Sequence, residues 1–184
     1  QLDALHASTK EFMKNQYHTL NRSLIPQLAQ NGLKLVRHHE DLTPKQAKYV
    51  DKYFEKDVYP VLTPMAVDSS RPFPLVRNKS LNIGALIYDK KKDVTDIATV
   101  QVPSVLPRIV RLPSEEKGVT EIILLEEVIE KNLDKLFLNY DIVCAYPYRI
   151  MRNADFSIDE EETADLLKEI EKQLKQRQWG EVIR

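Results

Sequence analysis

The residues best suited to chemistry are basic side chains placed in apolar or proline-fixed segments. An arginine guanidinium can donate two parallel hydrogen bonds to one phosphate, whereas a lysine ammonium acts as a compact point charge. Extended backbone stiffened by proline holds such a charge at a fixed point. The candidate anion-binding residues are Arg71, Arg77, Lys79, Arg108, Arg149 and Arg152.

Four of these residues, Arg71, Arg77, Lys79 and Arg108, are predicted to form one anion-attracting surface. Each lies in or beside a proline-rich segment. The net charge of −1 does not oppose a local basic patch, because acidic residues also gather elsewhere, as at Glu160–Glu162. The alternative is that the basic residues are scattered, each paired with a local carboxylate such as Asp68 or Asp155 or lying on the surface.

No metal site or catalytic residue is predicted in this chain. One cysteine and four histidines have no zinc-ligand spacing, and the four glycines form no phosphate-binding loop. The cluster His38-His39-Glu40-Asp41 favours a solvated loop over a metal site, since adjacent side chains point in different directions. The start of a helix explains the acidic run at Glu160.

Composition indicates a soluble globular chain of 184 residues, with a cytoplasmic location as the default. A net charge of −1 argues against nucleic acid as a partner, and no apolar run is long enough to span a membrane. Cys144 lies in an apolar run, which predicts a buried free thiol in a reducing compartment.

Helices are predicted for the front of the chain, residues 1–58. Apolar spacings of three and four indicate an amphipathic helix over 2–30, kinked or restarted at Pro26, with Gly32 as a left-handed cap and a short extended piece at 33–36. Thr43-Pro44-Lys45-Gln46 predicts a capped start for the next helix. We expect the two helices to form a hairpin that covers their apolar stripes.

The segment Tyr59–Ile83 is predicted to be an ordered, extended connector, because it holds four prolines and many apolar side chains. Behind it, alternation predicts strands beginning near Leu81, Asp96, Ile109, Ile122 and Ile142, with Pro147 marking an edge strand or a bulge. Helices are predicted over 126–137 and 159–178. The fold class is therefore α+β: a helical hairpin followed by a mixed α/β domain with about five to six strands and two helices.

Three ordered motifs of this sequence resemble a known family. The first is Val61-Leu62-Thr63-Pro64-Met65-Ala66-Val67-Asp68 with Arg71-Pro72-Phe73-Pro74 and Asn78-Lys79-Ser80-Leu81-Asn82. The others are Val102-Pro103-Ser104-Val105-Leu106-Pro107-Arg108 and Tyr148-Arg149-Ile150-Met151-Arg152-Asn153-Ala154-Asp155. Together they resemble the head, or middle, domain of the ATP-dependent, polyphosphate-synthesising type of polyphosphate kinase.

The resemblance implies that residues 1–58 are the end of an N-terminal helical domain and that 59–184 are a head domain truncated at its C-terminus. Because the helical pattern is already running at Leu2 and Leu5 and a strand pattern begins before Arg184, we expect a fragment. The parent enzyme would transfer the terminal phosphate of ATP reversibly onto polyphosphate through a phosphohistidine, with Mg²⁺.

The family's catalytic histidine motif matches no position here, so the resemblance implies a chain that is not an enzyme alone and binds no cofactor of its own. Its expected role is in subunit contacts and in flanking the tunnel for nucleotide and polyphosphate. Its expected partners are the remaining domains of the polypeptide and further copies in a homo-oligomer. The alternative is a free-standing interaction module that has the head fold and binds a protein or an anionic ligand.

Overall fold

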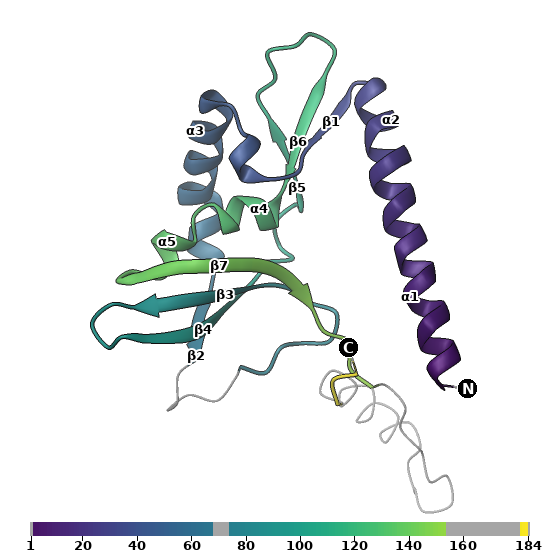
Figure 1. Ribbon diagram of the computed structural model, residues 1–184. Helices are drawn as coiled ribbons and strands as arrows, with labels where there is room; N and C mark the ends of the chain where they lie inside the picture. The colour runs from purple at the N-terminus through teal and green to yellow at the C-terminus, as the bar shows by residue number, and fades with distance from the viewer. Residues whose placement is uncertain (1, 68–73, 154–180, 184) are drawn as a thin grey trace, which may run out of the picture. The chain divides into compact units, whose positions relative to one another are not determined.

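The structure is a computed structural model that describes residues 2–67, 74–153 and 181–183 (Figure 1). Its contacts divide the chain into two compact units, each assembled from two stretches of sequence. The first unit is Gln1–Lys56 with Pro107–Val128, and the second is Asp57–Leu106 with Ile129–Arg184. The mixture of helices and antiparallel strands confirms the α+β class. A domain boundary at residue 58 stays a prediction.

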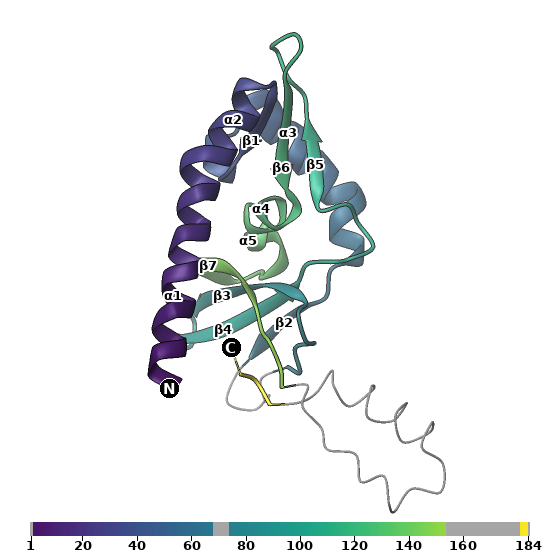
Figure 2. The ribbon, with the colours of Figure 1, turned by 90° about the vertical axis from the view of Figure 1, so that its right-hand side faces the viewer.

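The first unit begins with one long helical segment made of α1 (Leu2–Thr19), the π-helical turn η1 (Leu20–Leu24) and α2 (Ile25–Gln30) (Figures 1 and 2). Pro26 stands at the start of α2, where its missing N–H is tolerated. This confirms the predicted restart. No residue of α1 is buried, so the expected covering of its apolar stripe by the second helix is not found. Leu2, Phe12 and Tyr17 are among its exposed side chains.

Three strands form the sheet of the first unit, in the order β1 (Leu33–Val36), β6 (Thr120–Leu124), β5 (Ile109–Leu112). Strand β1 runs parallel to β6, and β5 runs antiparallel to it. Gly32 has a φ of 80°, as its predicted left-handed role requires, and its carbonyl accepts a hydrogen bond of 2.8 Å from the Thr120 N–H. The bond fixes the start of the β1–β6 register.

Helix α3 (Pro44–Tyr53) begins with the predicted capping box: Thr43 Oγ1 accepts from the Gln46 N–H, and Gln46 Oε1 accepts from the Thr43 N–H. Before it lies the short 3-10 helix η2 (His39–Asp41), and after it the π-helical turn η3 (Phe54–Val58). The buried Gln46 amide also donates to the Pro113 carbonyl and to Glu121 Oε2, which ties α3 to the β5–β6 hairpin.

The second unit contains an antiparallel sheet in the order β2 (Pro64–Val67), β4 (Val94–Gln101), β3 (Leu81–Asp89), β7 (Tyr140–Arg149). Ile83, Ala85 and Ile87 on one face of β3 are buried, which confirms the predicted alternation. Strand β7 lies at the sheet edge, beside β3 in both views (Figures 1 and 2), which confirms the edge position predicted from Pro147.

The segment Tyr59–Ile83 is more than a connector. It begins with the 3-10 helix η4 (Tyr59–Val61), and its residues Pro64–Val67 form β2, the second edge of the sheet. The helix predicted over 126–137 is divided into α4 (Leu125–Glu130) and α5 (Leu133–Leu136). The helix predicted over 159–178 lies outside the described residues.

The burial predicted for Cys144 is wrong, because its thiol is exposed. Cys144 pairs with Leu86, so its side chain lies on the face of the sheet opposite the buried Ile83, Ala85 and Ile87. An irregularity in the β3–β7 register at Leu86/Ile87 sets which residues of β7 face the core. The sequence carries an apolar run here, and the edge position leaves part of it uncovered.

Candidate anion-binding site

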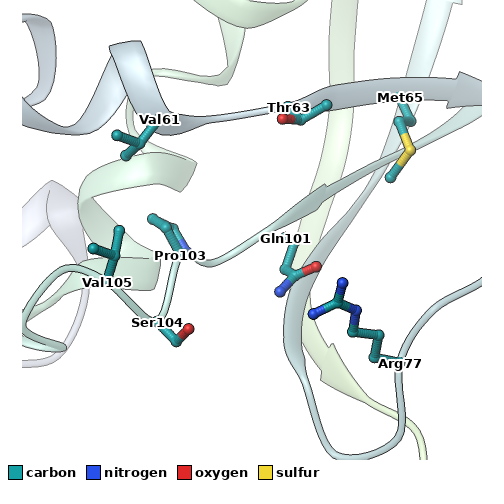
Figure 3. Close-up of a pocket in the computed structure, with 8 residues that line it drawn as sticks. All are labelled: Val61, Thr63, Met65, Arg77, Gln101, Pro103, Ser104 and Val105. Carbon is teal, nitrogen blue, oxygen red and sulfur yellow. The ribbon is translucent and has the colours of Figure 1, made fainter. Parts of the chain in front are cut away.

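A cleft of about 410 Å³ opens in the second unit, beside the edge strand β2 (Figure 3). It is formed by the chain that enters β2, by the loop before β3, and by the end of β4 with the segment that follows it. The lining residues are Val61, Thr63, Met65, Arg77, Gln101, Pro103, Ser104 and Val105. Two of the three family-like motifs therefore meet in one place.

The cleft has a polar end and an apolar end. In Figure 3 the Arg77 guanidinium and the Gln101 amide point toward each other, while Val61 and Val105 lie at the other end. The apolar end is open to solvent, since Val61 is 45% and Val105 75% exposed. A guanidinium beside a neutral amide can hold an anionic group by charge-assisted hydrogen bonds. The arrangement suits an anion, and the described lining residues include no nucleophile paired with a base.

Arg77 belongs to a short loop, residues 76–80, that also carries Lys79. The loop is anchored by the buried Val76, whereas Arg77 and Lys79 are exposed. Lys79 adopts the left-handed conformation with a φ of 60°, and its N–H donates to the Ile150 carbonyl at 2.9 Å. Among the described residues, no carboxylate forms an ion pair with Arg77 or Lys79. Both charges therefore face solvent.

Arg152, another candidate from the sequence, has a different task. Its Nε and Nη2 atoms donate to the Val76 carbonyl at 3.1 and 2.8 Å, and its backbone N–H donates to Asn78 Oδ1 at 3.1 Å. The guanidinium is thus turned inward onto the 76–80 loop. Arg149 is exposed at the end of β7.

Arg108 lies in the first unit and is held by a buried carboxylate. Its Nε donates to both Glu126 oxygens at 3.1 Å, and its Nη2 also donates to Oε1. The hydrogen bonds to Glu126 raise the pKa of the Arg108 guanidinium. The Glu126 side chain is 5% exposed and that of Arg108 is 54% exposed. Arg108 thus has the local carboxylate partner that the alternative interpretation expected, although with Glu126.

The structure brings together two of the four predicted residues, Arg77 and Lys79, in one loop. Arg71 lies outside the described residues, and Arg108 belongs to the other unit. A single surface formed by all four stays a prediction. Sequence reasoning missed Thr63, Gln101 and Ser104, whose small or neutral side chains carry no distinctive spacing. The available signal was that Thr63 and Ser104 lie inside family-like motifs and that Gln101 directly precedes one.

The histidine cluster forms contacts with carboxylates. His39 donates its backbone N–H to Glu127 Oε2 at 3.1 Å, and its Nδ1 lies 3.4 Å from the same oxygen. Within the residues that the structure describes, no group of three or more His, Cys, Asp or Glu side chains is arranged to hold a metal ion. The same residues include no helix that is long and apolar enough to cross a membrane.

The described fold and cleft define an α+β domain that presents exposed cations beside an apolar hollow. Comparison with known families gives the particular assignment. Residues 45–184 match the family model described as the polyphosphate kinase middle domain. The chain belongs to the polyphosphate kinase family, as the three motifs indicated.

Individual relatives agree with this assignment. The chain is 47% identical to a polyphosphate kinase of Lactiplantibacillus plantarum and 45% identical to one of Exiguobacterium sibiricum, in each case over all of this chain and 25% of the relative. A crystal structure of polyphosphate kinase from Porphyromonas gingivalis shares the fold with a TM-score of 0.72 and 24% identity, over 81% of this chain and 25% of that one. The chain spans about a quarter of the length of these relatives.

Proposed function

We propose that the polypeptide containing this chain is an ATP-dependent polyphosphate kinase, and that residues 1–184 supply a non-catalytic part of it. The whole enzyme would transfer the terminal phosphate of ATP reversibly onto polyphosphate through a phosphohistidine. The support is membership of the family and the match to its middle domain. Mg²⁺ belongs to the proposal for the whole enzyme, and no step is assigned to it in this chain.

Within that enzyme, we propose that the head domain attracts and guides the phosphate chain through Arg71, Arg77, Lys79 and Arg108. The observation that carries this role is the 76–80 loop, where Arg77 and Lys79 are exposed and Arg77 lines the cleft. Polyphosphate carries a dense line of negative charge, so exposed cations raise its local concentration. Because Arg108 is already paired with Glu126, its share of the attraction should be smaller.

Three further parts of the proposal follow from the family alone. The head domain would contact another subunit of a homo-oligomer, it would flank the tunnel for nucleotide and polymer, and the enzyme would work in the cytoplasm. The competing function is an interaction module that binds a protein or an anionic ligand. The exposed apolar side chains of the cleft, Val61, Met65 and Val105, favour that alternative.

The test is titration with long-chain polyphosphate at two salt concentrations. Arg77→Gln/Lys79→Gln removes two exposed ion pairs with phosphate groups. At about threefold for each pair, binding should weaken about tenfold at low salt. The loss should shrink at 1 M salt, where the Debye length falls to about 3 Å from about 10 Å at 0.1 M. Lys91→Gln/Lys92→Gln is the matched control, because it removes the same charge in the turn at the opposite end of β3.

Equal weakening by the two double variants would mean that only net charge matters and would refute a localised site. If both retain the affinity of the unaltered protein for polyphosphate, the interaction-module alternative becomes the better account. The control lies about 30 Å from the 76–80 loop, since a nine-residue strand rises about 3.3 Å per residue.

A further inference from the structure

Arg152 is the residue that connects the 76–80 loop to the end of β7. Its guanidinium spans the carbonyl of Val76 through Nε and Nη2, and its backbone N–H holds the side chain of Asn78. The two residues that flank Arg77 in the sequence are therefore both bound by Arg152. One residue thus restrains the carbonyl of Val76 on one side of the exposed cation and the side chain of Asn78 on the other.

A second restraint acts at Lys79. Its N–H donates to the Ile150 carbonyl at 2.9 Å, two residues before Arg152, while its backbone holds a φ of 60°. The left-handed conformation is unfavourable for a residue with a Cβ atom, so it persists only where neighbouring contacts maintain it. The loop is held in this shape by residues 150–152, which directly follow β7.

The segment that follows β7 also forms hydrogen bonds on its other side. The N–H of Asn153 donates to the Glu181 carbonyl at 2.7 Å, and the N–H of Ile183 donates to the Met151 carbonyl at 2.8 Å, around an antiparallel bridge between Arg152 and Val182. Arg152 therefore projects from backbone that is paired on both sides. Because its backbone is held in this way, the Arg152 side chain can keep the 76–80 loop in a fixed position.

The contact requires arginine rather than a positive charge. Two N–H groups of one planar guanidinium converge on a single carbonyl, which fixes the direction of that carbonyl as well as its distance. A lysine ammonium would keep the charge and lose the planar fork. Val76 is buried, so its carbonyl has little access to water as a replacement partner.

We propose that Arg152 is a positioning residue for anion binding: it sets the loop so that Arg77 lies at the polar end of the cleft beside Gln101. This inference rests on the proposed anion-binding role of the loop. In this proposal Arg152 does not itself contact the anion. The phosphate chain meets Arg77 and Lys79, and Arg152 acts through them.

A double-mutant cycle in the full-length protein, with long-chain polyphosphate as the probe, tests the proposal. Arg152→Lys should weaken polyphosphate binding about threefold, the size of one exposed ion pair, although the charge is retained. In the Arg77→Gln/Lys79→Gln background the same change should have no further effect, because the residues through which Arg152 acts are gone. Arg111→Lys, the same substitution at an exposed position of β5, is the control and should bind as the unaltered protein does.

Amide hydrogen exchange gives the structural readout. In Arg152→Lys the Lys79 amide, which is bonded to Ile150, should exchange faster, while amides paired between β3 and β4 should keep their protection. Loss of protection throughout the sheet would mean that Arg152 stabilises the whole second unit and not the 76–80 loop in particular, and would overturn the proposal.

The outcomes separate this inference from the function on which it rests. If neutralising Arg77 and Lys79 weakens binding but Arg152→Lys does not, or weakens it equally in both backgrounds, Arg152 is not a positioning residue and the proposed function stands. If neutralising the loop leaves binding unchanged, the proposed anion-binding role is wrong, and the role of Arg152 in it is wrong as well.

Discussion

Replacing Gly32 by alanine should destabilise the first unit more than the same change at Gly118. Both glycines have left-handed backbones, with φ of 80° and 83°. An added Cβ at Gly32 would lie 2.9 Å from the Gly118 carbonyl oxygen, whereas at Gly118 it would meet no atom within 4 Å. Alanine at either position therefore has the same unfavourable backbone conformation, and only alanine at Gly32 also has a steric clash.

The magnitude follows from these two parts. An L-residue in the left-handed region costs about 1–2 kcal/mol, which applies to both variants. At Gly32 the backbone must also shift away from Gly118, which weakens the hydrogen bond from the Thr120 N–H to the Gly32 carbonyl, worth about 1 kcal/mol. We expect a loss of about 1–2 kcal/mol in the free energy of unfolding for Gly118→Ala and about 2–3 kcal/mol for Gly32→Ala.

Urea denaturation of the two variants and the unaltered protein measures this difference, with amide exchange at Thr120 as the local probe. The Thr120 amide should lose protection in Gly32→Ala and retain it in Gly118→Ala. Equal destabilisation by both substitutions would refute the steric argument and would leave backbone conformation as the whole effect. A larger loss at Gly118 would mean that the β1–β6 register does not depend on the close approach of the two loops.

Two further predictions concern the ends of elements. Thr43→Ala should lower the free energy of unfolding by about 1 kcal/mol, because the Gln46 N–H loses the hydroxyl that caps α3. Urea denaturation measures this loss, with Thr43→Ser, which keeps the capping hydroxyl, as the control. A hydrogen bond from the Tyr88 hydroxyl to Asp93, 2.7 Å long, raises the pKa of Tyr88. A raised folded pKa means that its contribution to stability is present below the ordinary pKa of about 10 and is lost as the pH rises through the folded value. Tyr88→Phe should therefore be less stable than the unaltered protein at neutral pH and lose that difference in alkali; a difference that does not depend on pH would contradict the assigned hydrogen bond.

Much of the local structure could be predicted from the sequence because it depends on short-range physics. Alternating apolar residues identified β3 and its buried face, and Thr43 with Gln46 identified the start of α3. Pro26 marked the restart of the first helix, and Gly32 the left-handed residue after α2. In each case a neighbour within four residues, or the residue's own backbone preference, decides the conformation. The three motifs were sufficient to indicate the family as well.

The partners of those elements were decided by tertiary structure. The strand pattern does not say that β1 pairs with β6, across more than eighty residues, or that the strands divide into two sheets. Pairing partners are selected by which apolar faces can be buried together, a property of the whole chain. The exposed thiol of Cys144 has the same origin, because an apolar run in a strand predicts burial only when the sheet has a covered face on that side.

The candidate site shows the same division. Residue type and an apolar or proline-fixed context selected Arg77, Lys79 and Arg152 as cations suited to phosphate. Type alone could not separate their tasks, since a guanidinium that grips an anion and one that grips a carbonyl use the same N–H groups. The fold turns Arg152 onto Val76 and leaves Arg77 facing the cleft. The type of a side chain determines which groups it can bind. Which of those groups Arg152 meets is determined by a segment more than seventy residues away in the sequence.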